Sequence, residues 1–492
     1  MHRFGWISER LDALGENISS QTSEILDEVG IPRDEEFVQI LQDIPEGKYE
    51  YAVGLFQCMV AATRPLSLKE LVDISLELDS KAGPHEDAVL TACPDLIRVV
   101  RDEDDHPTVH FTHKSVKDFL TSSRLRALSV ENGSRFSLKA ANTTLARVCV
   151  HVLLRFDDEA RKTQLTQSPL ALYAARHWVQ HTQQGSVSTE NQAAMERLFD
   201  PSKSHLEAWL WMHDVDKSQS RTVEDLAERP PYRRVTPLYY AAFCGFTELV
   251  KHLVTPEGLI DSRGYHGTPL HAASFKGHNE VVQELLRVDG DFKILDKEVR
   301  NKTPLQAAYY GGQLKTMAQL LEKGAEVDLR PKGALDNTLL HCASLDGRLD
   351  VVKLLIKFDA VVDARDRIGW TPLHRAALRE RLDVAEYLLR LRFRDEEDEN
   401  STVEPADVDA QSNNKNTPLH VASIVGNFQI VELLMKNGAR RDIKGEHGWT
   451  PAEAAEKSRH EKIVERLLRG RSGGDLFREG FDRLRRYYPR PE

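Results

Sequence analysis

The sequence predicts a mainly α-helical protein whose C-terminal half is a stack of short helical repeats. Three observations lead to this prediction. A Thr-Pro-Leu-His motif, or a close variant of it, recurs from Thr236 onward with a period of about 33 residues. Small residues recur at fixed distances behind this motif, and an apolar stripe with helical spacing follows it. Self-similarity of this kind is typical of solenoids.

Each position of the motif has a physical role. The threonine is expected to cap the first helix of a unit, and the proline suits the first turn of that helix, where no N–H is needed. A small residue five positions behind the threonine lets neighbouring helices approach closely. The seven threonines are Thr236, Thr268, Thr303, Thr338, Thr371, Thr417 and Thr450, and six of the small residues are Ala241, Ala273, Ala308, Ala343, Ala376 and Ala422.

The rest of each unit completes a pair of helices. Glycine follows the alanine by four positions at Gly245, Gly277, Gly312, Gly347 and Gly426, where a left-handed residue is expected to end the inner helix. The outer helix has a buried face with i, i+3 and i+4 spacing, as at Val281, Val282, Leu285 and Leu286. No unit can bury this face alone, so the units are expected to stack. The pattern resembles the ankyrin repeat and covers residues 231–470.

Composition and charge narrow the class of protein. The 492 residues carry a net charge of −11, which argues against a general nucleic-acid binder. Residues 1–10 lack the apolar run of a secretory signal, and the apolar stretch 51–62 is shorter than the ~20 residues that span a bilayer. The five cysteines lie far apart with no Cys-x-x-Cys pair, which is typical of a reducing compartment. We therefore expect a cytoplasmic protein, with the nucleus as the alternative.

Residues 46–125 are expected to form helices and one β-hairpin. An apolar helix over 49–63 ends at Arg64 and Pro65, and residues 67–70 (SLKE) are a capping box that opens a second helix. A third helix over 86–93, strands over 96–101 and 108–112 with a polar turn between them, and a last helix from Ser115 complete the elements. Three helices, a hairpin and a helix describe a winged-helix domain.

Four stretches resemble the fungal NACHT–ankyrin proteins, which belong to the signal-transducing ATPase class related to animal NOD-like receptors. Residues 64–71 (RPLSLKEL) and 109–120 (VHFTHKSVKDFL) look like the winged helix that follows the NTPase domain there. Residues 145–154 (LARVCVHVLL) and 172–178 (LYAARHW) resemble the helical module that leads into the repeats, and residues 31–45 resemble the preceding linker, about two residues short. The resemblance implies a receptor-like or scaffold role in a fungus.

One element of that family is missing from the sequence. Its NTPase carries a P-loop, G-x-x-x-x-G-K-[ST], whose backbone amides cradle phosphates. No such run occurs here; residues 470–474 (GRSGG) are glycine-rich but lack the lysine and a strand–helix context. We therefore expect no nucleotide and no other cofactor. Either the gene encodes a genuine short form or the sequence is truncated upstream.

The remaining segments complete the expected organisation. Residues 1–45 would be a helical remnant of the NACHT region and its linker, and residues 126–230 a helical linker that caps the first repeat. An insertion near 394–407 contains the acidic run 395–400, which is expected to be solvated, although a partner-binding arm is the alternative. Residues 471–492 form a basic, amphipathic tail, expected to be a surface helix, with a nuclear-import patch as the alternative.

The sequence contains few residues in patterns that are typical of catalysis or metal binding. His271, His341, His374 and His420 recur at one repeat position, so we expect hydrogen bonding within turns and no metal ligation. His110 and His113 lack further ligands at zinc-binding spacing. No Gly-x-Ser-x-Gly elbow or His-Glu-x-x-His element is present. We therefore expect neither an enzyme nor a metalloprotein.

The candidate site is the concave surface that inner helices line in ankyrin stacks. The residue two positions behind the recurring alanine is apolar through six repeats, which predicts an exposed apolar row of the kind that marks an interface. The candidate partner-binding residues are Tyr240, Phe243, Phe275, Lys276, Tyr310, Leu345, Arg375, Leu378, Arg379 and Ile424. The alternatives are that these side chains pack against the inner helix of the next repeat, or that the N-terminal module folds back over them.

Two functions remain open at this point. The first is a protein-interaction scaffold or receptor-like adaptor that binds a protein partner through the repeats. The second is a nuclear transcription co-regulator that uses the same surface. Neither membrane nor nucleic-acid binding is expected, and composition does not separate the two functions.

Overall fold

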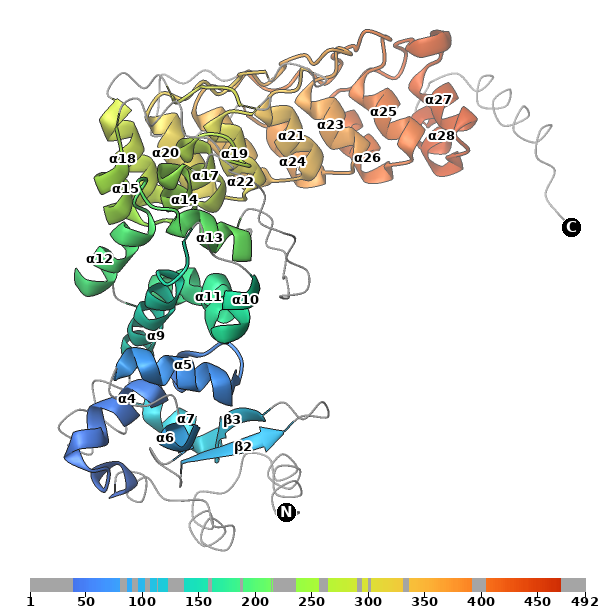
Figure 1. The fold of residues 1–492 in the computed structure, drawn as a ribbon. Helices are drawn as coiled ribbons and strands as arrows, with labels where there is room; N and C mark the ends of the chain where they lie inside the picture. Colours follow the sequence, from blue (N-terminus) through green and yellow to red (C-terminus); the bar gives the residue numbers. More distant parts are fainter. Residues whose placement is uncertain are drawn as a thin grey trace, which may run out of the picture. The chain divides into compact units, whose positions relative to one another are not determined.

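The structure, a computed structural model, divides the chain into two compact units, Met1–Pro237 and Leu238–Glu492 (Figure 1). The residues it describes are 39–79, 86–90, 96–101, 107–112, 114–122, 137–157, 162–185, 189–213, 215, 236–255, 264–289, 294–299, 302–330, 336–391 and 404–469. Most of the predicted N-terminal remnant, the turn 102–106, most of the predicted insertion and the tail 471–492 lie outside them. The predicted fold class is confirmed: helical repeats, a helical module and a winged helix.

The winged-helix part of the first unit follows the predicted order. Helix α4 (Glu46–Ala61) is followed by strand β1 (Leu66–Ser67), α5 (Leu68–Leu78), α6 (Glu86–Leu90), strands β2 (Ile97–Arg101) and β3 (Pro107–Phe111), and α7 (Lys114–Thr121). The predicted capping box is confirmed, because Ser67 Oγ accepts from the Glu70 amide at 3.2 Å while a Glu70 carboxylate oxygen accepts from the Ser67 amide at 2.7 Å.

The three strands form an antiparallel sheet in the order β1-β3-β2. Val109 in β3 is the partner of Leu66 in β1 and of Val99 in β2, so the predicted hairpin is confirmed to within one residue. Strand β1 was not predicted, because two residues are too short to show the alternation that identifies a strand.

A helical module completes the first unit. It consists of α9 (Leu138–Leu153), α10 (Lys162–Gln167), α11 (Ala171–Gln184), α12 (Thr189–Leu198) and α13 (His205–Met212). Helix α9 packs on α4, α5 and α11, so the winged helix and the module share a core. Buried Asp73 on α5 accepts from Ser168 Oγ at 3.0 Å and from the Leu170 amide at 3.1 Å, and these bonds hold the two parts together.

The second unit is a stack of seven helix pairs. The inner helices are α14 (Pro237–Cys244), α17 (Pro269–Lys276), α19 (Pro304–Tyr310), α21 (Leu339–Asp346), α23 (Pro372–Leu378), α25 (Pro418–Val425) and α27 (Pro451–Lys457). The outer helices are α15 (Thr247–Leu253), α18 (Asn279–Asp289), α20 (Leu314–Glu322), α22 (Leu349–Lys357), α24 (Leu382–Leu389), α26 (Phe428–Lys436) and α28 (Glu461–Leu468). A 3-10 turn, η2 (Glu446–Gly448), precedes the last pair.

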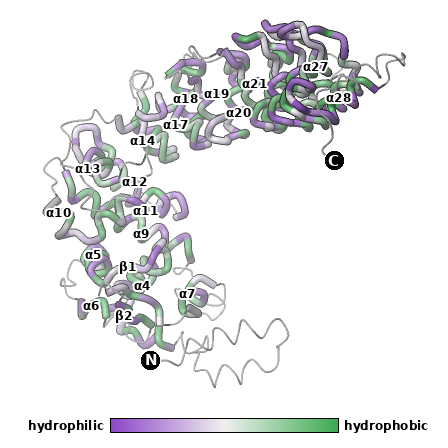
Figure 2. The backbone as a smooth tube through the Cα atoms, turned by 90° about the vertical axis from the view of Figure 1, so that its right-hand side faces the viewer, coloured by the Kyte–Doolittle hydropathy of each residue, from purple (hydrophilic) through white to green (hydrophobic). Residues whose placement is uncertain are grey.

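The stack has two layers of helices. Inner helices pack on inner helices, as α21 does on α23, and outer helices pack on outer helices, as α22 does on α24 (Figure 1). Hydrophobic and hydrophilic residues alternate along these helices (Figure 2), as expected where one face of each is buried. The recurring alanines lie where the layers are closest; Ala273, Ala343 and Ala422 are all fully buried.

The turn behind each inner helix needs a left-handed residue, as predicted. Gly277 and Gly347 end their helices with φ of 81° and 78°. The same position is Glu380 in the fifth repeat and Arg459 in the seventh, with φ of 55° and 63°. The stack therefore imposes this turn even where a side chain makes it unfavourable.

A row of carboxylates joins consecutive hairpins. The Oδ2 atoms of Asp328 and Asp363 accept from the amides of Val361 and Asp407 at 2.9 Å, and Asp409 Oδ1 accepts from the Arg440 amide at the same distance. Sequence reasoning missed this set, although a Val-Asp pair recurs at residues 327–328, 362–363 and 408–409, and the aspartates of the last two pairs lie eight residues before a recurring threonine.

Candidate functional site

The recurring histidines fix each inner helix to the next repeat. The backbone amide of Thr371 donates to His374 Nδ1 at 3.1 Å, so the proton of the neutral ring is on Nε2. That Nε2–H donates to the Asn416 carbonyl oxygen, 3.0 Å away in the sixth repeat. His341 bonds to Trp370 O and His420 to Trp449 O in the same way.

Burial keeps these rings neutral. It lowers the pKa of His271 and His374 to about 4, and it lowers the pKa of His341 and His420 as well. Because both ring nitrogens are used in hydrogen bonds, the predicted hydrogen-bonding role is confirmed. The bonds also extend beyond the turn, since each ring reaches the following repeat.

Side chains at the N-terminal end of the predicted apolar row are buried, which corrects part of the sequence prediction. Tyr240 and Phe243 are each only 4% exposed. The ring of His266, from the next hairpin, stacks on Phe243 with centroids 5.5 Å apart and on Phe275 at 4.3 Å. Lys276 Nζ covers the other part of Phe243, 4.6 Å from its centroid. Tyr240 and Phe243 are therefore core residues.

Arg375 is a second correction. Its side chain is buried, and its guanidinium donates to Asp366 Oδ2 at 2.5 Å while lying 5.0 Å from the Trp370 ring centroid. Sequence reasoning placed it on the surface because it precedes the recurring Ala376 by one position and because arginine is typical of interfaces. The acidic partner comes from the hairpin of its own repeat, which the motif did not reveal.

From the third repeat onward, the side chains of the predicted row are exposed or half-buried. Tyr310 is 54% exposed and Ile424 is 42% exposed, whereas Leu345 and Leu378 are half-buried. Phe275 is half-buried as well, and Lys276 and Arg379 are exposed. Lys302 Nζ lies 4.4 Å from the Tyr310 ring centroid and leaves the rest of that ring to solvent.

A second apolar row accompanies the first, and sequence reasoning missed it. It consists of Leu314, Leu349, Leu382 and Phe428, each four positions behind a member of the first row and at the start of an outer helix. The first three are half-buried and Phe428 is 40% exposed. The two rows flank the turn between inner and outer helices. We call the eight residues Tyr310, Leu345, Leu378, Ile424, Leu314, Leu349, Leu382 and Phe428 the apolar double row.

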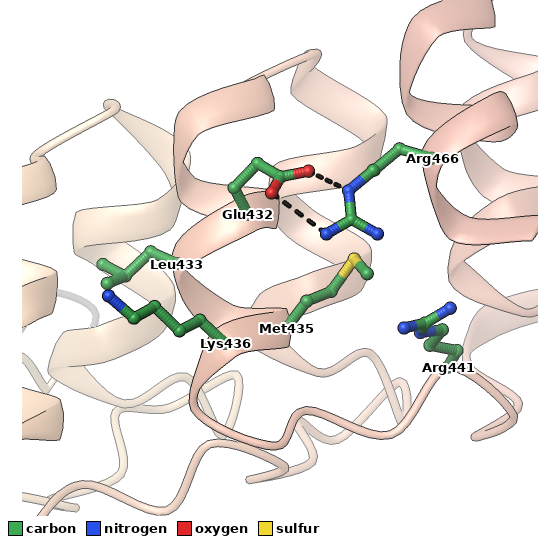
Figure 3. Close-up of a pocket in the computed structure, with 6 residues that line it drawn as sticks. All are labelled: Glu432, Leu433, Met435, Lys436, Arg441 and Arg466. Carbon is green, nitrogen blue, oxygen red and sulfur yellow. Dashed lines mark hydrogen bonds and ion pairs between the residues drawn. The ribbon is translucent and has the colours of Figure 1, made fainter. Parts of the chain in front are cut away.

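A shallow recess lies on the outer layer, between α26 and α28 (Figure 3). Arg466 is paired there with the Glu432 carboxylate, and Arg441 Nη1 donates to the carbonyl oxygens of Leu467 and Arg469 at 3.3 and 2.8 Å. Glu432, Arg441 and Arg466 are thus engaged in holding the last two repeats together, so the recess offers no obvious chemistry.

The thiols and histidines of the first unit serve its core. Burial raises the pKa of Cys58 to about 12, which leaves this thiol protonated and poorly nucleophilic. Tyr173 Oη and Asn142 Oδ1 lie 3.0 and 2.7 Å from the two ring nitrogens of His181, and all three residues are buried. Burial lowers the pKa of His181 to about 4. This network binds α9 to α11, and its position offers no access to a substrate.

Comparison with known families decides what the second unit is. The family description "Ankyrin repeats (3 copies)" matches residues 211–297, 238–331, 305–402 and 399–476, which together span more than half of the chain. The chain is an ankyrin-repeat protein. A second description, "GPI inositol-deacylase, winged helix domain", matches residues 46–154 and so extends from the winged helix through α9.

Relatives of this ankyrin-repeat protein share parts of it. It is 26% identical over 241 residues to "Azaphilone pigments biosynthesis cluster protein L" of Monascus ruber, which covers 45% of this chain and 50% of that protein. It is 43% identical over 61 residues to "Ankyrin repeat and IBR domain-containing protein 1" of Mus musculus and of Homo sapiens, which covers 12% of this chain and 6% of those proteins. The chain thus spans at most half the length of these relatives.

Ankyrin repeats imply that this chain is a protein–protein interaction scaffold. None of the helices within the described ranges has both the length and the apolar character needed to cross a bilayer.

Proposed function

We propose that this protein is a non-enzymatic scaffold that binds a protein partner through the apolar double row of its repeats. The observation that carries the proposal is the exposure of Tyr310, Ile424 and Phe428 on one periodic surface, at 54%, 42% and 40%. Large apolar side chains in a contiguous arrangement mark protein interfaces, and aromatic residues contribute most to binding energy there.

A non-enzymatic role is part of the proposal. It is supported by the state of the thiol on α21: partial burial raises the pKa of Cys342 to about 11. It is also supported by the recurring histidines, whose ring nitrogens are both engaged in hydrogen bonds, one within the repeat and one to the next repeat. Neither group is poised for acid–base or nucleophilic catalysis at neutral pH.

Within this function we propose a receptor-like adaptor of the NACHT–ankyrin kind that acts in the cytoplasm. The match of residues 46–154 to a winged helix domain supports this, as does the similarity of 241 residues to a fungal protein. That relative is named for a pigment biosynthesis cluster, which is compatible with a regulatory scaffold. The alternative is a nuclear co-regulator with the same surface, and the distribution of a fluorescently tagged full chain between cytoplasm and nucleus distinguishes the two.

The experiment uses a photo-crosslinking amino acid at position 310 of the full chain, expressed in its own host. A partner captured there is identified by mass spectrometry, and its affinity for the purified chain is then measured. Tyr310→Ser combined with Ile424→Ser is expected to weaken binding at least about tenfold, because each truncation removes an exposed apolar anchor.

The matched control removes apolar area elsewhere on the same unit. Val361→Ser combined with Ile368→Ser affects two hairpin residues that are 56% and 39% exposed. This control is expected to leave the affinity within about twofold, as is usual for contacts outside an interface. Equal losses from both double variants would contradict the proposal, as would capture at position 361 and none at 310.

A further inference from the structure

The hairpins of the repeats carry a row of exposed cations. The connections between successive helix pairs lie together along one edge of the second unit (Figure 1). From the hairpin before the third repeat to the hairpin before the seventh, each contributes at least one exposed lysine or arginine, although the chain as a whole has a net charge of −11. We call these residues the basic hairpin row: Lys302, Arg330, Arg365, Arg367, Lys415 and Lys444.

The charges of this row are not neutralised by the hairpins themselves. Within the described ranges, none of the six cations forms an ion pair with a carboxylate. Arg330 Nη1 donates to the Arg365 carbonyl oxygen at 2.9 Å, and the Arg365 guanidinium donates to the Gln411 carbonyl oxygen, but a carbonyl oxygen carries no net charge. On the outer helices, by contrast, several cations pair with a carboxylate of the same or the preceding outer helix: Lys251, Arg287, Arg390, Arg466 and Arg469.

The carboxylates close to the row are mostly used for other contacts. Asp366 is buried and pairs with Arg375 at 2.5 Å. Glu446 remains exposed beside the C-terminal end of the row, where one of its carboxylate oxygens lies 3.5 Å from Asn416 Nδ2. Three further carboxylates accept hydrogen bonds from backbone amides of the following hairpin region: Asp328, Asp363 and Asp409. The exposed side of the row is therefore cationic.

Hydrogen bonds between neighbouring hairpins make the row continuous. The Asn413 amide donates to the Ile368 carbonyl oxygen and Asn413 Nδ2 to the Arg367 carbonyl oxygen, both at 3.0 Å, and the Glu446 amide donates to Asn416 Oδ1 at 3.0 Å. Because packed helices lie ~8–10 Å apart, the four hairpins from Arg330 to Lys444 span about 24–30 Å. An extended segment rises ~3.3 Å per residue, so about seven to nine residues cover this distance and about every third residue meets a hairpin.

We infer that the basic hairpin row binds an extended acidic segment of the protein partner, with an aspartate or glutamate at about every third position. This inference rests on the proposed function and specifies the chemistry of the partner. Lys302 Nζ lies 4.4 Å from the centroid of the Tyr310 ring, so the row adjoins the apolar double row and one partner can contact both. A nucleic-acid strand fits the row less well, since it carries a charge every ~3.4 Å and the chain's net charge repels a polyanion.

Synthetic peptides test the charge requirement on the purified full chain. The probe is a fluorescent ten-residue peptide with glutamate at its first, fourth, seventh and tenth positions and Ser-Gly between them. Two matched peptides carry glutamine or lysine in place of the glutamates. In fluorescence anisotropy at low ionic strength, the glutamate peptide is expected to bind at least about tenfold more tightly than either. Added salt should weaken this binding, because the charges of the row are exposed.

Three members of the row can be replaced without loss of a bond between hairpins. Within the described ranges the side chains of Arg367, Lys415 and Lys444 make no hydrogen bond, and their combined replacement by glutamine is expected to weaken binding of the glutamate peptide at least about tenfold. The matched control removes the same charge from the C-terminal ends of three outer helices and is expected to stay within about twofold: Lys323→Gln, Lys357→Gln and Lys436→Gln.

A charge reversal guards against loss of structure. The triple variant Arg367→Glu, Lys415→Glu and Lys444→Glu should bind the lysine peptide in preference to the glutamate peptide. Equal binding of the glutamate and glutamine peptides to the wild type would overturn the inference, as would equal losses in the hairpin and outer-helix variants. A single-stranded oligonucleotide that binds more tightly than the glutamate peptide, through the same three residues, would assign the row to nucleic acid instead. Failure of the crosslinking experiment at position 310 would reject the double row and leave these readouts valid.

Discussion

His374 donates its Nε2–H to the backbone carbonyl oxygen of Asn416, at 3.0 Å, across the boundary between the fifth and sixth repeats. Forty-two residues separate the two in sequence, because the longest connection of the stack lies between them. The bond fixes the hairpin of the sixth repeat against the inner helix of the fifth.

Removal of this ring is expected to destabilise the second unit. His374→Ala leaves the amide of Thr371 and the carbonyl of Asn416 without their partner and opens a cavity, which together cost about 2–4 kcal/mol of unfolding free energy. Urea unfolding at pH 7 measures the loss. His447→Ala is the control, since His447 is an exposed hairpin residue, and a loss of similar size there would contradict the explanation.

Stability is expected to fall as the pH is lowered from about 6.5 towards 4. Burial lowers the pKa of His271 and His374 to about 4, whereas in the unfolded chain it is ~6.5. Between these values the unfolded state binds protons that the folded state does not, so acid favours unfolding. Within this range, each such histidine lowers the unfolding free energy by at most about 1.4 kcal/mol for every pH unit of acidification.

The third repeat supplies the variant for this measurement. Gln306 occupies the histidine position there and forms the same capping box with Thr303. The double variant His271→Gln with His374→Gln is therefore expected to fold, and its unfolding free energy should depend less steeply on pH between 6.5 and 4.5. Urea titrations at pH 7, 6 and 5 give the slopes. Identical slopes for wild type and variant would show that other groups cause the acid sensitivity.

Two aromatic residues of the predicted row, Phe243 and Tyr310, should behave oppositely. Phe243→Ala removes a ring that stacks with His266 and Tyr239, and is expected to cost about 3–5 kcal/mol. Tyr310→Ala removes a ring that is 54% exposed, and is expected to cost less than about 1 kcal/mol. Thermal unfolding of both variants compares them. A larger loss for Tyr310→Ala would reverse the assignment of core and surface.

The winged helix is expected not to bind duplex DNA. Residues 67–109 contain eleven acidic residues and four basic ones, whereas contact with phosphates requires the opposite balance. Helix α6 is only five residues long and its sequence, EDAVL, carries two acids. A gel-shift experiment with the full chain at low salt should show no retardation at micromolar protein. Saturable binding that weakens with added salt would disprove this.

Local chemistry explains which features the sequence could predict. A capping threonine, a left-handed glycine such as Gly277 and a capping box such as Ser67 with Glu70 are each determined by residues within five positions of one another. The exposure of the candidate row depends instead on side chains from elsewhere. Phe243 is buried because His266 reaches it from the next hairpin, and Arg375 is buried because Asp366 and Trp370 surround it.

The second apolar row could have been found from the sequence, because Leu314, Leu349, Leu382 and Phe428 keep a constant distance from the recurring alanine. The hairpin carboxylates Asp328, Asp363 and Asp409 could be found in a similar way, because each follows a valine and the last two lie eight residues before a recurring threonine. Periodicity shows that such positions matter to the stack. It does not show whether a side chain packs inward, joins two repeats or remains accessible, since all three uses recur with the same period.

The ring-to-carbonyl bonds between repeats lie one after another along the stack, so a pulling force on its two ends would load them in series. Three of these links, from His341, His374 and His420, have donor–acceptor distances of 2.9–3.0 Å. The link from Gln306 to the Leu329 carbonyl oxygen is 3.4 Å long and therefore weaker. Under tension the Gln306 link should break first among these, while the bonds of Tyr309 to Asp346 and to Arg348 continue to hold the third and fourth repeats together.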